Sequence, residues 1–92
     1  MKKVMINNIE YEIIKDYKNG FVKDDVYDKV TDYFDGFDYI LGDWAYGKLR
    51  LKGFCEKTNK NFKKINDIAL VDDYIKNNCA YECRHFILKK IV

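Results

Sequence analysis

The sequence predicts an α+β fold: a single domain, residues 1–92, in which two helices pack on an antiparallel or mixed sheet. Strand-like and helix-like segments follow one another in the order ββαββαβ, an order that places helices on a sheet. A length of 92 residues suits one hydrophobic core rather than two. Hydrophobic residues make up 48% of the chain, and eight Tyr, six Phe and one Trp supply apolar surface for that core.

The first two strands are predicted to form a β-hairpin around Asn7-Asn8, because asparagine tolerates the positive φ of a tight two-residue turn. Such a turn pairs Ile6 with Ile9, Val4 with Tyr11 and Lys3 with Glu12. This register gathers the apolar side chains on one face of the hairpin and leaves a charged pair on the other.

A helix is predicted from about Asp25 to Asp35. Asp24 is placed to cap its start and Gly36 to end it. The paired acidic residues at its start are interpreted as solvated helix residues rather than an acid–base pair, because adjacent helix positions point apart. Apolar residues at helical spacing mark the inner face: Val26, Val30, Tyr33, Phe34 and Phe37.

A second hairpin is predicted from the segments 38–44 and 48–54 around Ala45-Tyr46-Gly47, with Gly47 in the left-handed position after a type I turn. Leucines and cations alternate strictly along the second of these strands. The alternation predicts that Leu49 and Leu51 are buried beneath the sheet, and that the cations between and beside them occupy the opposite, solvated face.

The remaining elements are a loop over 56–61, a short extension over 62–65, a helix from Asp67 to Asn78 and a strand from Arg84 to Ile91. Asn66 is the expected N-cap of this helix, with Ile65 and Leu70 as a hydrophobic staple. The inner face of the helix is predicted to hold Ile68, Val71, Ile75 and Cys79. The apolar centre of the last strand, Phe86-Ile87-Leu88, predicts a position inside the sheet rather than at its edge.

Charge is distributed unevenly although the formal net charge is only +2. Between residues 23 and 43, seven Asp stand against two Lys; between 48 and 64, six Lys and one Arg stand against one Glu. This predicts opposite faces or neighbouring elements that neutralise each other. No segment is apolar and long enough to span a membrane, and no signal peptide is visible, so we expect a cytoplasmic protein without membrane partners.

Residues 38–54, DYILGDWAYGKLRLKGF, resemble the signature of the YutD-like family of small bacterial proteins. The resemblance covers nearly the whole chain, including the opening hairpin and the segment 79–83 before the last strand. The family pattern more usually has Gly where this chain has Ala45 and Gln where it has Lys48, so this member is more basic. The resemblance implies an α+β fold and a bacterial cytoplasmic setting, and it supplies no catalytic residues.

The cysteines and the single histidine form the most site-like cluster in the sequence. Cys79, Cys83 and His85, with Cys55 as a fourth ligand, would make a Cys3His zinc site, although the spacing is not that of a zinc knuckle. A redox pair of Cys79 and Cys83, or a Cys83–His85 nucleophile pair, is the alternative. Buried structural thiols and an ordinary strand histidine are favoured over these, and no cofactor or metal is expected.

The second hairpin carries the predicted binding site: Trp44, Tyr46, Lys48, Arg50 and Lys52. Cations contact phosphates and aromatic rings stack on unpaired bases, so this pattern is typical of a surface for single-stranded nucleic acid. A protein-interaction or regulatory adaptor role is the alternative function for the same residues. In a purely structural interpretation, the aromatic residues belong to the core and the cations form an ordinary solvated face. Without a glycine-rich phosphate loop, a serine or a plausible triad, we expect a non-enzymatic binding module.

Overall fold

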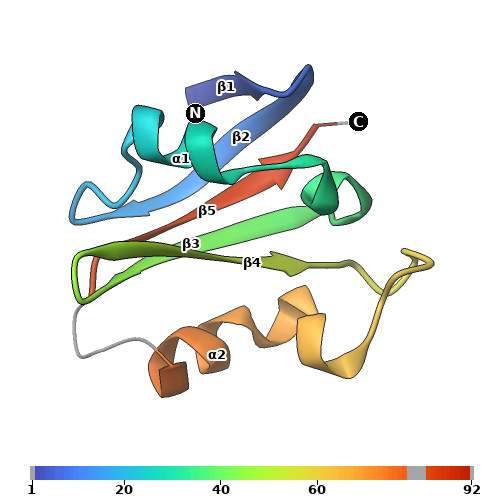
Figure 1. Ribbon diagram of the computed structural model, residues 1–92. Coiled ribbons are helices and arrows are strands. Elements are labelled where there is room, and N and C mark those ends of the chain that lie inside the picture. The colour runs from blue at the N-terminus through green and yellow to red at the C-terminus, as the bar shows by residue number, and fades with distance from the viewer. Residues whose placement is uncertain (1, 79–82, 92) are drawn as a thin grey trace.

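A computed structural model describes residues 2–78 and 83–91 of the chain and confirms the α+β fold (Figure 1). Its centre is a five-stranded sheet in the order β1-β2-β5-β3-β4, in which all neighbouring strands are antiparallel. The strands are β1 (Lys2–Ile6), β2 (Ile9–Tyr17), β3 (Tyr39–Ala45), β4 (Lys48–Phe54) and β5 (His85–Lys90). The helices are α1 (Lys23–Lys29) and α2 (Val71–Asn78), with the 3-10 turns η1 (Asp32–Gly36), η2 (Lys64–Asn66) and η3 (Ile68–Leu70).

The first hairpin has the predicted register. Ile6 pairs with Ile9, Val4 with Tyr11 and Lys3 with Glu12. Asn7 and Asn8 both adopt positive φ, 53° and 66°, as a two-residue turn of this kind requires. The last strand is also placed as predicted, because β5 is the central strand and pairs with β2 on one side and β3 on the other.

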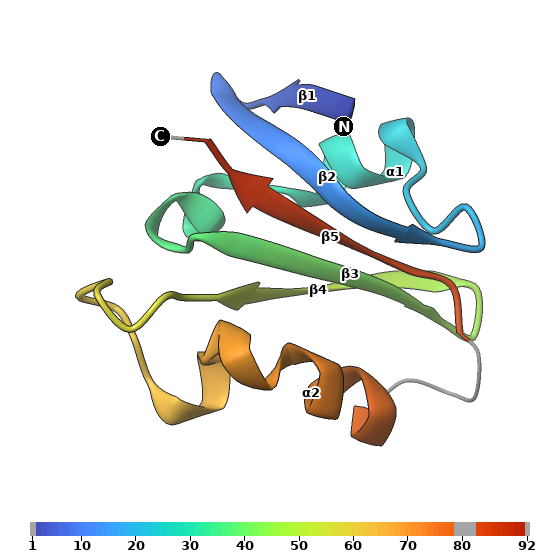
Figure 2. The same ribbon diagram turned by 180° about the vertical axis from the view of Figure 1, so that it is seen from behind.

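Each face of the sheet has its own core, and one helix covers each face (Figures 1 and 2). We call them the α1 face and the α2 face. On the α1 face the phenyl ring of Phe86 lies over Gly42, where a Cβ would approach Phe86 Cζ to 2.1 Å. The α1-face core contains Ile6, Tyr11, Ile13, Val26, Val30, Phe34, Ile40, Leu49, Phe86 and Leu88. The α2-face core contains Tyr39, Leu41, Phe54 and Ile87, covered by Ile68, Val71, Tyr74 and Ile75.

The predicted helix over 25–35 is wrong in its extent. Helix α1 begins at Lys23 after Val22, whose side chain makes no capping bond, so Asp24 is not the cap. The helix ends when Val30 turns extended, and a separate 3-10 turn follows. The side chain of Asn7 donates a 2.6 Å hydrogen bond to the Val30 carbonyl, so a contact from the first hairpin satisfies the backbone where the helix stops. Tyr33 consequently points to solvent, not into the core.

The segment before α2 also differs from the prediction. Residues 62–65 form no strand, and the helix expected to start at Asp67 begins as a 3-10 turn and becomes α-helical only at Val71. Asp67, rather than Asn66, caps this turn by accepting a hydrogen bond from the Ala69 N–H. Asn66 is buried instead, and its side chain bonds to the loop at Lys63 and Asn61. Ile65 and Leu70 are both exposed, so the predicted staple does not form.

The second hairpin forms with β3 shifted by one residue relative to the predicted segment. Its turn has two residues, Tyr46 and Gly47, with φ of 54° and 75°. The left-handed Gly47 is confirmed, but positive φ at both positions belongs to a type I′ turn rather than type I. Leu49 is buried as predicted, whereas Leu51 is only partly buried. No helix in the described part of the chain is long and apolar enough to cross a bilayer.

Candidate binding surface on the second hairpin

The structure divides the predicted binding residues between the two faces of the sheet and the turn. Trp44 lies with the α1-face core, while Lys48, Arg50 and Lys52 alternate onto the α2 face. Tyr46 occupies the tip of the turn and is fully exposed. The aromatic ring of Trp44 and the cationic groups of Arg50 and Lys52 therefore do not form one continuous platform.

The side chain of Trp44 connects β3 to the loop between β2 and α1. Its indole Nε1 donates a 2.7 Å hydrogen bond to the Gly20 carbonyl, and the Arg84 guanidinium lies 4.6 Å from its ring centroid. Gly20 itself packs so closely on the backbone of His85 that a Cβ would lie 2.5 Å from the His85 carbonyl oxygen. Contacts within the chain therefore occupy the Nε1 edge of the indole, through Gly20, and one face of the ring, through Arg84.

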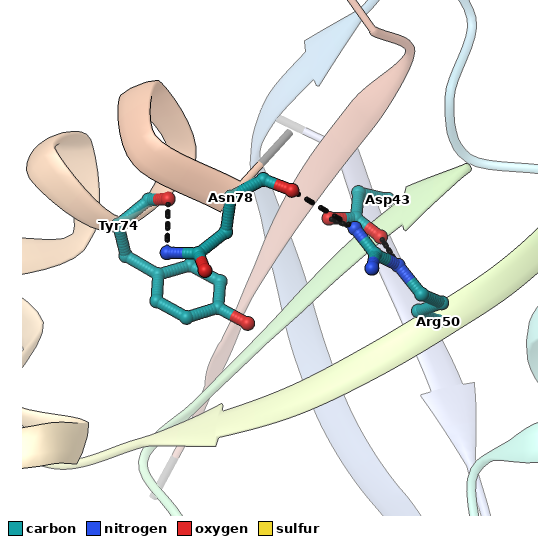
Figure 3. Close-up of polar contacts among 4 residues, drawn as sticks. All are labelled: Asp43, Arg50, Tyr74 and Asn78. Carbon is teal, nitrogen blue, oxygen red and sulfur yellow. Dashed lines mark hydrogen bonds and ion pairs between the residues drawn. The ribbon is translucent and has the colours of Figure 1, made fainter. Parts of the chain in front are cut away.

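Arg50 joins three elements of the fold (Figure 3). Its Nε and a terminal guanidinium nitrogen donate to the two carboxylate oxygens of Asp43 at 2.8 and 2.9 Å. The same terminal nitrogen donates to the Asn78 carbonyl at the end of α2, at 3.2 Å. Asp43 is only 4% exposed, so a bidentate cationic partner offsets the cost of burying its charge. Arg50 is therefore a link between β4, β3 and α2, and not a freely available phosphate contact.

The pair formed by Asp43 and Arg50 belongs to a row of polar residues across the α2 face. On β5, His85 lies opposite Asp43, and on β2, Tyr17 lies opposite His85 with its ring stacked at 5.0 Å. His85 Nδ1 is 2.9 Å from the Cys83 carbonyl and donates to it, whereas the buried Nε2 finds no partner among the described residues. Sequence reasoning missed this row because its members come from four strands, and only the register brings them side by side.

Lys48 and Lys52 differ in their surroundings. The Lys52 ammonium lies 5.3 Å from the ring centroid of Phe54 and 5.2 Å from that of Tyr74, so it covers the α2-face core. Lys48 is exposed beside the turn, where it borders a hollow of about 260 Å³ with Trp44 and with Asp25 and Asp28 of α1. Residues of the acidic segment 23–43 and of the basic segment 48–64 therefore line one hollow. An ion pair of Asp43 with Arg50 joins the two segments.

A larger groove, of about 540 Å³, runs beside β4 between η1 and the segment 60–66. We call it the β4 groove. Tyr33 and Ile65, 69% and 75% exposed, are among the side chains that line it. Gly53 forms part of its floor under the ring of Phe37, where a Cβ would lie 2.3 Å from Phe37 Cγ. Within 2–78 and 83–91, the lining is Tyr33, Phe34, Phe37, Leu51, Lys52, Gly53, Lys60, Asn61, Phe62, Lys63, Ile65 and Asn66, a set with three lysines and no acidic residue.

Strand β4 is an edge of the sheet, and its peptide groups at the groove face outward. Cys55, just after β4, accepts from Ile68 N–H at 3.1 Å and donates to the Asn66 carbonyl at 2.7 Å, which directs its backbone away from β3. Phe54, by contrast, accepts from the Asp38 N–H on the β3 side. Since successive residues of a strand alternate in this direction, Gly53 and Leu51 present their N–H and C=O groups to the open edge. Both of them line the β4 groove.

The described residues do not assemble the metal or thiol site considered from the sequence. Cys55 is buried, and burial raises the pKa of its thiol. His85 contacts the backbone of Cys83, and Cys79 lies outside the described residues. Within 2–78 and 83–91, no group of three or more His, Cys, Asp or Glu side chains is placed to hold a metal ion.

Comparison with known proteins assigns the chain to a family. Residues 5–89 match the family described as "Putative antitoxin YutD-like". The chain belongs to the YutD-like family. A relative in Bacillus subtilis (strain 168), named "Putative antitoxin YutD", is 38% identical over 88 residues, which cover 96% of this chain and 97% of the relative. The solution NMR structure of the B. subtilis YutD protein superposes with a TM-score of 0.81 at 36% identity, covering 99% of this chain and 83% of that one.

The resemblance of residues 38–54 to the YutD-like family is therefore confirmed, and the match extends over nearly the whole chain. Within that segment several residues have structural roles, since Gly42 admits the ring of Phe86, Gly53 admits that of Phe37, and Asp43 pairs with Arg50. These contacts explain the residue types at these positions by packing and charge pairing.

Proposed function

We propose that this YutD-like protein is a non-enzymatic, cytoplasmic antitoxin that acts by binding another protein through the outer edge of its second hairpin. The family description and the name of the B. subtilis relative both use the word antitoxin. A protein that neutralises a toxin by contact needs a surface for it. The observation that carries the proposal is the open edge of β4, which lies in a groove lined by aromatic rings and lysines.

A protein partner fits the geometry better than a single-stranded nucleic acid does. Binding a strand of bases requires rings and cations on one surface. Trp44 lies on the opposite face of the sheet from Arg50 and Lys52, and Arg50 is held by Asp43 and Asn78. Lys48 lines a hollow together with Trp44, which brings one cation and one ring together but not a row of them. An outward-facing strand edge, in contrast, is a ready-made template for the backbone of another polypeptide.

The first experiment identifies the partner. The tagged protein is purified, with and without nuclease, from the bacterium that encodes it, alongside a Lys60→Glu/Lys63→Glu variant of the groove. A Lys57→Glu/Lys64→Glu variant changes the charge equally with lysines outside the groove lining. We expect a protein that survives nuclease treatment, is retained by the control variant and is lost from the groove variant.

The second experiment tests the antitoxin role directly. The recovered partner is expressed alone and together with the wild-type chain or either variant. Growth should stop with the partner alone, recover with the wild type and the control variant, and recover poorly with the groove variant. A partner that is harmless when expressed alone would overturn the antitoxin role, and recovery of nucleic acid without protein would overturn protein binding.

A further inference from the structure

We infer that the β4 groove receives an extended acidic segment of the partner, which adds to the sheet as a sixth strand along Leu51 and Gly53. The inference rests on the proposed protein-binding role and names the part of the partner that is recognised. Main-chain hydrogen bonds at a sheet edge supply affinity in this mode of binding, while side-chain pockets beside the edge supply selectivity.

The chain itself already occupies the adjoining position of this edge. Residues 66 and 68 bond to both backbone groups of Cys55, and Asp67 pairs with Cys55 in a parallel bridge. One step back along the strand, Gly53 presents the next outward pair of backbone groups, and Leu51 the pair after that. Among the described residues no strand pairs with β4 on this side, so the pairing along this edge stops at Cys55, and the groove begins there.

The side chains around the edge select the chemistry of the incoming segment. Lys60 and Lys63 are exposed at the groove, and none of the described residues that line it is acidic, so the groove favours carboxylates over cations. Tyr33 and Ile65 expose apolar surface on its walls, although large exposed apolar side chains are few among the described residues. A strand that alternates acidic and apolar residues would satisfy both, with its backbone on Leu51 and Gly53.

The test uses peptides selected from a phage-displayed library of random linear sequences on immobilised wild-type protein. We expect enrichment of Asp and Glu alternating with apolar residues. Amide hydrogen exchange by NMR then locates the bound peptide. In the free protein the amide of Leu51, which is partly exposed, should exchange faster than those of Arg50 and Lys52, and the amide of Gly53 should exchange more slowly than that of Leu51 because Gly53 is buried beneath Phe37. Saturating peptide should slow both outward amides, that of Leu51 about tenfold or more.

A matched pair of substitutions separates backbone pairing from side-chain contact. Leu51→Pro removes the outward N–H without touching the β3–β4 ladder, a position where an edge strand tolerates proline. Leu51→Ala removes the side chain and keeps the N–H. The proline variant should bind the selected peptide about tenfold more weakly than the alanine variant, which corresponds to one lost hydrogen bond.

Charge reversal tests the acidic preference. Lys60→Glu/Lys63→Glu should weaken binding about tenfold at low salt, with a smaller difference at high salt, whereas Lys57→Glu/Lys64→Glu should change it less than about threefold. The exchange measurement on the wild type needs no variant, so it decides the matter even where Leu51→Pro does not fold.

Three outcomes overturn the inference: bound peptide that leaves the Leu51 and Gly53 amides exchanging as before, selected peptides without acidic enrichment, or a single-stranded oligonucleotide that displaces the peptide and protects the same amides. If a toxin partner binds the Leu51→Pro variant as tightly as the wild type, strand addition is excluded as the binding mode, while the proposed antitoxin function stands. If the peptides bind as expected but the recovered partner is harmless, strand addition is supported and the antitoxin role is excluded.

Discussion

The two faces of the sheet bury their side chains in different ways. The α1 face is an almost wholly apolar layer of aromatic and aliphatic residues from all five strands, α1 and η1. The α2 face has a smaller apolar core, and beside it lies the polar row of Tyr17, His85, Asp43 and Arg50. Strand β4 contributes side chains to both faces. Its leucines pack in the α1-face core, and one of its cations, Arg50, forms an ion pair on the α2 face.

This difference shows why a run of alternating residues is an incomplete guide to a binding site. Leu49 and Arg50 are neighbours in sequence, and the alternation places them correctly on opposite faces. Alternation alone does not reveal that the cationic face is partly covered. Asp43 and the end of α2, which engage Arg50, come from elsewhere in the chain.

The largest effect is expected from the α1 face. Leu49 is buried within its core, so Leu49→Ala should lower the free energy of unfolding by about 2–5 kcal/mol, as large-to-small core changes do. Leu51 is partly exposed at the β4 groove, and Leu51→Ala should cost about 1 kcal/mol. Urea denaturation of both variants measures the difference. Equal losses would show that the two leucines are equally buried.

On the α2 face, Tyr39 is expected to make the free energy of unfolding fall at alkaline pH. Burial, a 2.6 Å hydrogen bond to Glu56 and the charges of Glu56 and Asp38 raise the pKa of Tyr39 to about 12. Because this value lies above the ordinary 10.0, the stabilisation is complete below pH 10 and is lost as pH rises toward 12, a total of about 3 kcal/mol.

Thermal unfolding measured across this pH range tests the assignment. Tyr39→Phe should be less stable than the wild type at neutral pH, since it loses the hydrogen bond, and should lose less stability between pH 10 and 12. Tyr46→Phe, at the exposed turn, serves as the control and should follow the wild-type profile. An alkaline profile of Tyr39→Phe identical to that of the wild type would argue against this role.

The polar row should show an intermediate effect through Arg50. Arg50→Ala leaves the buried Asp43 carboxylate without its bidentate partner, and we expect a loss of about 2 kcal/mol. A double-mutant cycle with Asp43→Ala should return a coupling energy of similar size. Arg50→Lys should recover only part of the loss, because an ammonium cannot form the two parallel bonds. Additive single-mutant effects would contradict the pairing.

The smallest effect is expected at the turn. Lys48 and Tyr46 are both exposed, so Lys48→Ala and Tyr46→Ala should each change the free energy of unfolding by less than about 0.5 kcal/mol. The same urea titrations supply the measurement. A loss as large as that of Arg50→Ala at either position would mean that the turn carries a structural contact comparable to the Asp43–Arg50 pair.

Local patterns were sufficient for elements held by neighbouring residues. The Asn7-Asn8 turn fixes the register of β1 and β2, because a two-residue turn leaves no freedom in pairing. The apolar run of β5 marks a central strand, since both of its faces are buried. The leucine–cation alternation of β4 likewise assigned its two faces.

Where distant contacts compete with local preference, the sequence alone misled. Helical spacing from Val26 to Phe37 suggests one helix, but the Asn7 side chain takes the Val30 carbonyl and the helix stops. Asn66 has the chemistry of an N-cap, yet it is buried in bonds to its own loop. At Val30 a hydrogen bond from a distant segment satisfies a carbonyl that a longer helix would otherwise have paired, whereas the Asn66 side chain is used within its own loop and is not available as a cap.

By itself, then, the sequence determined the α+β class, the two hairpins, the central position of the last strand and the family. These follow from periodicity and turn chemistry, which act over a few residues. Only the tertiary structure decided which surface is open. The pairing of Asp43 with Arg50, the anchoring of Trp44 on Gly20 and the groove at Leu51 and Gly53 each join segments distant in sequence. Which surface stays open depends on the segments that pack beside it, and the residue pattern within one strand does not specify which distant segments those are.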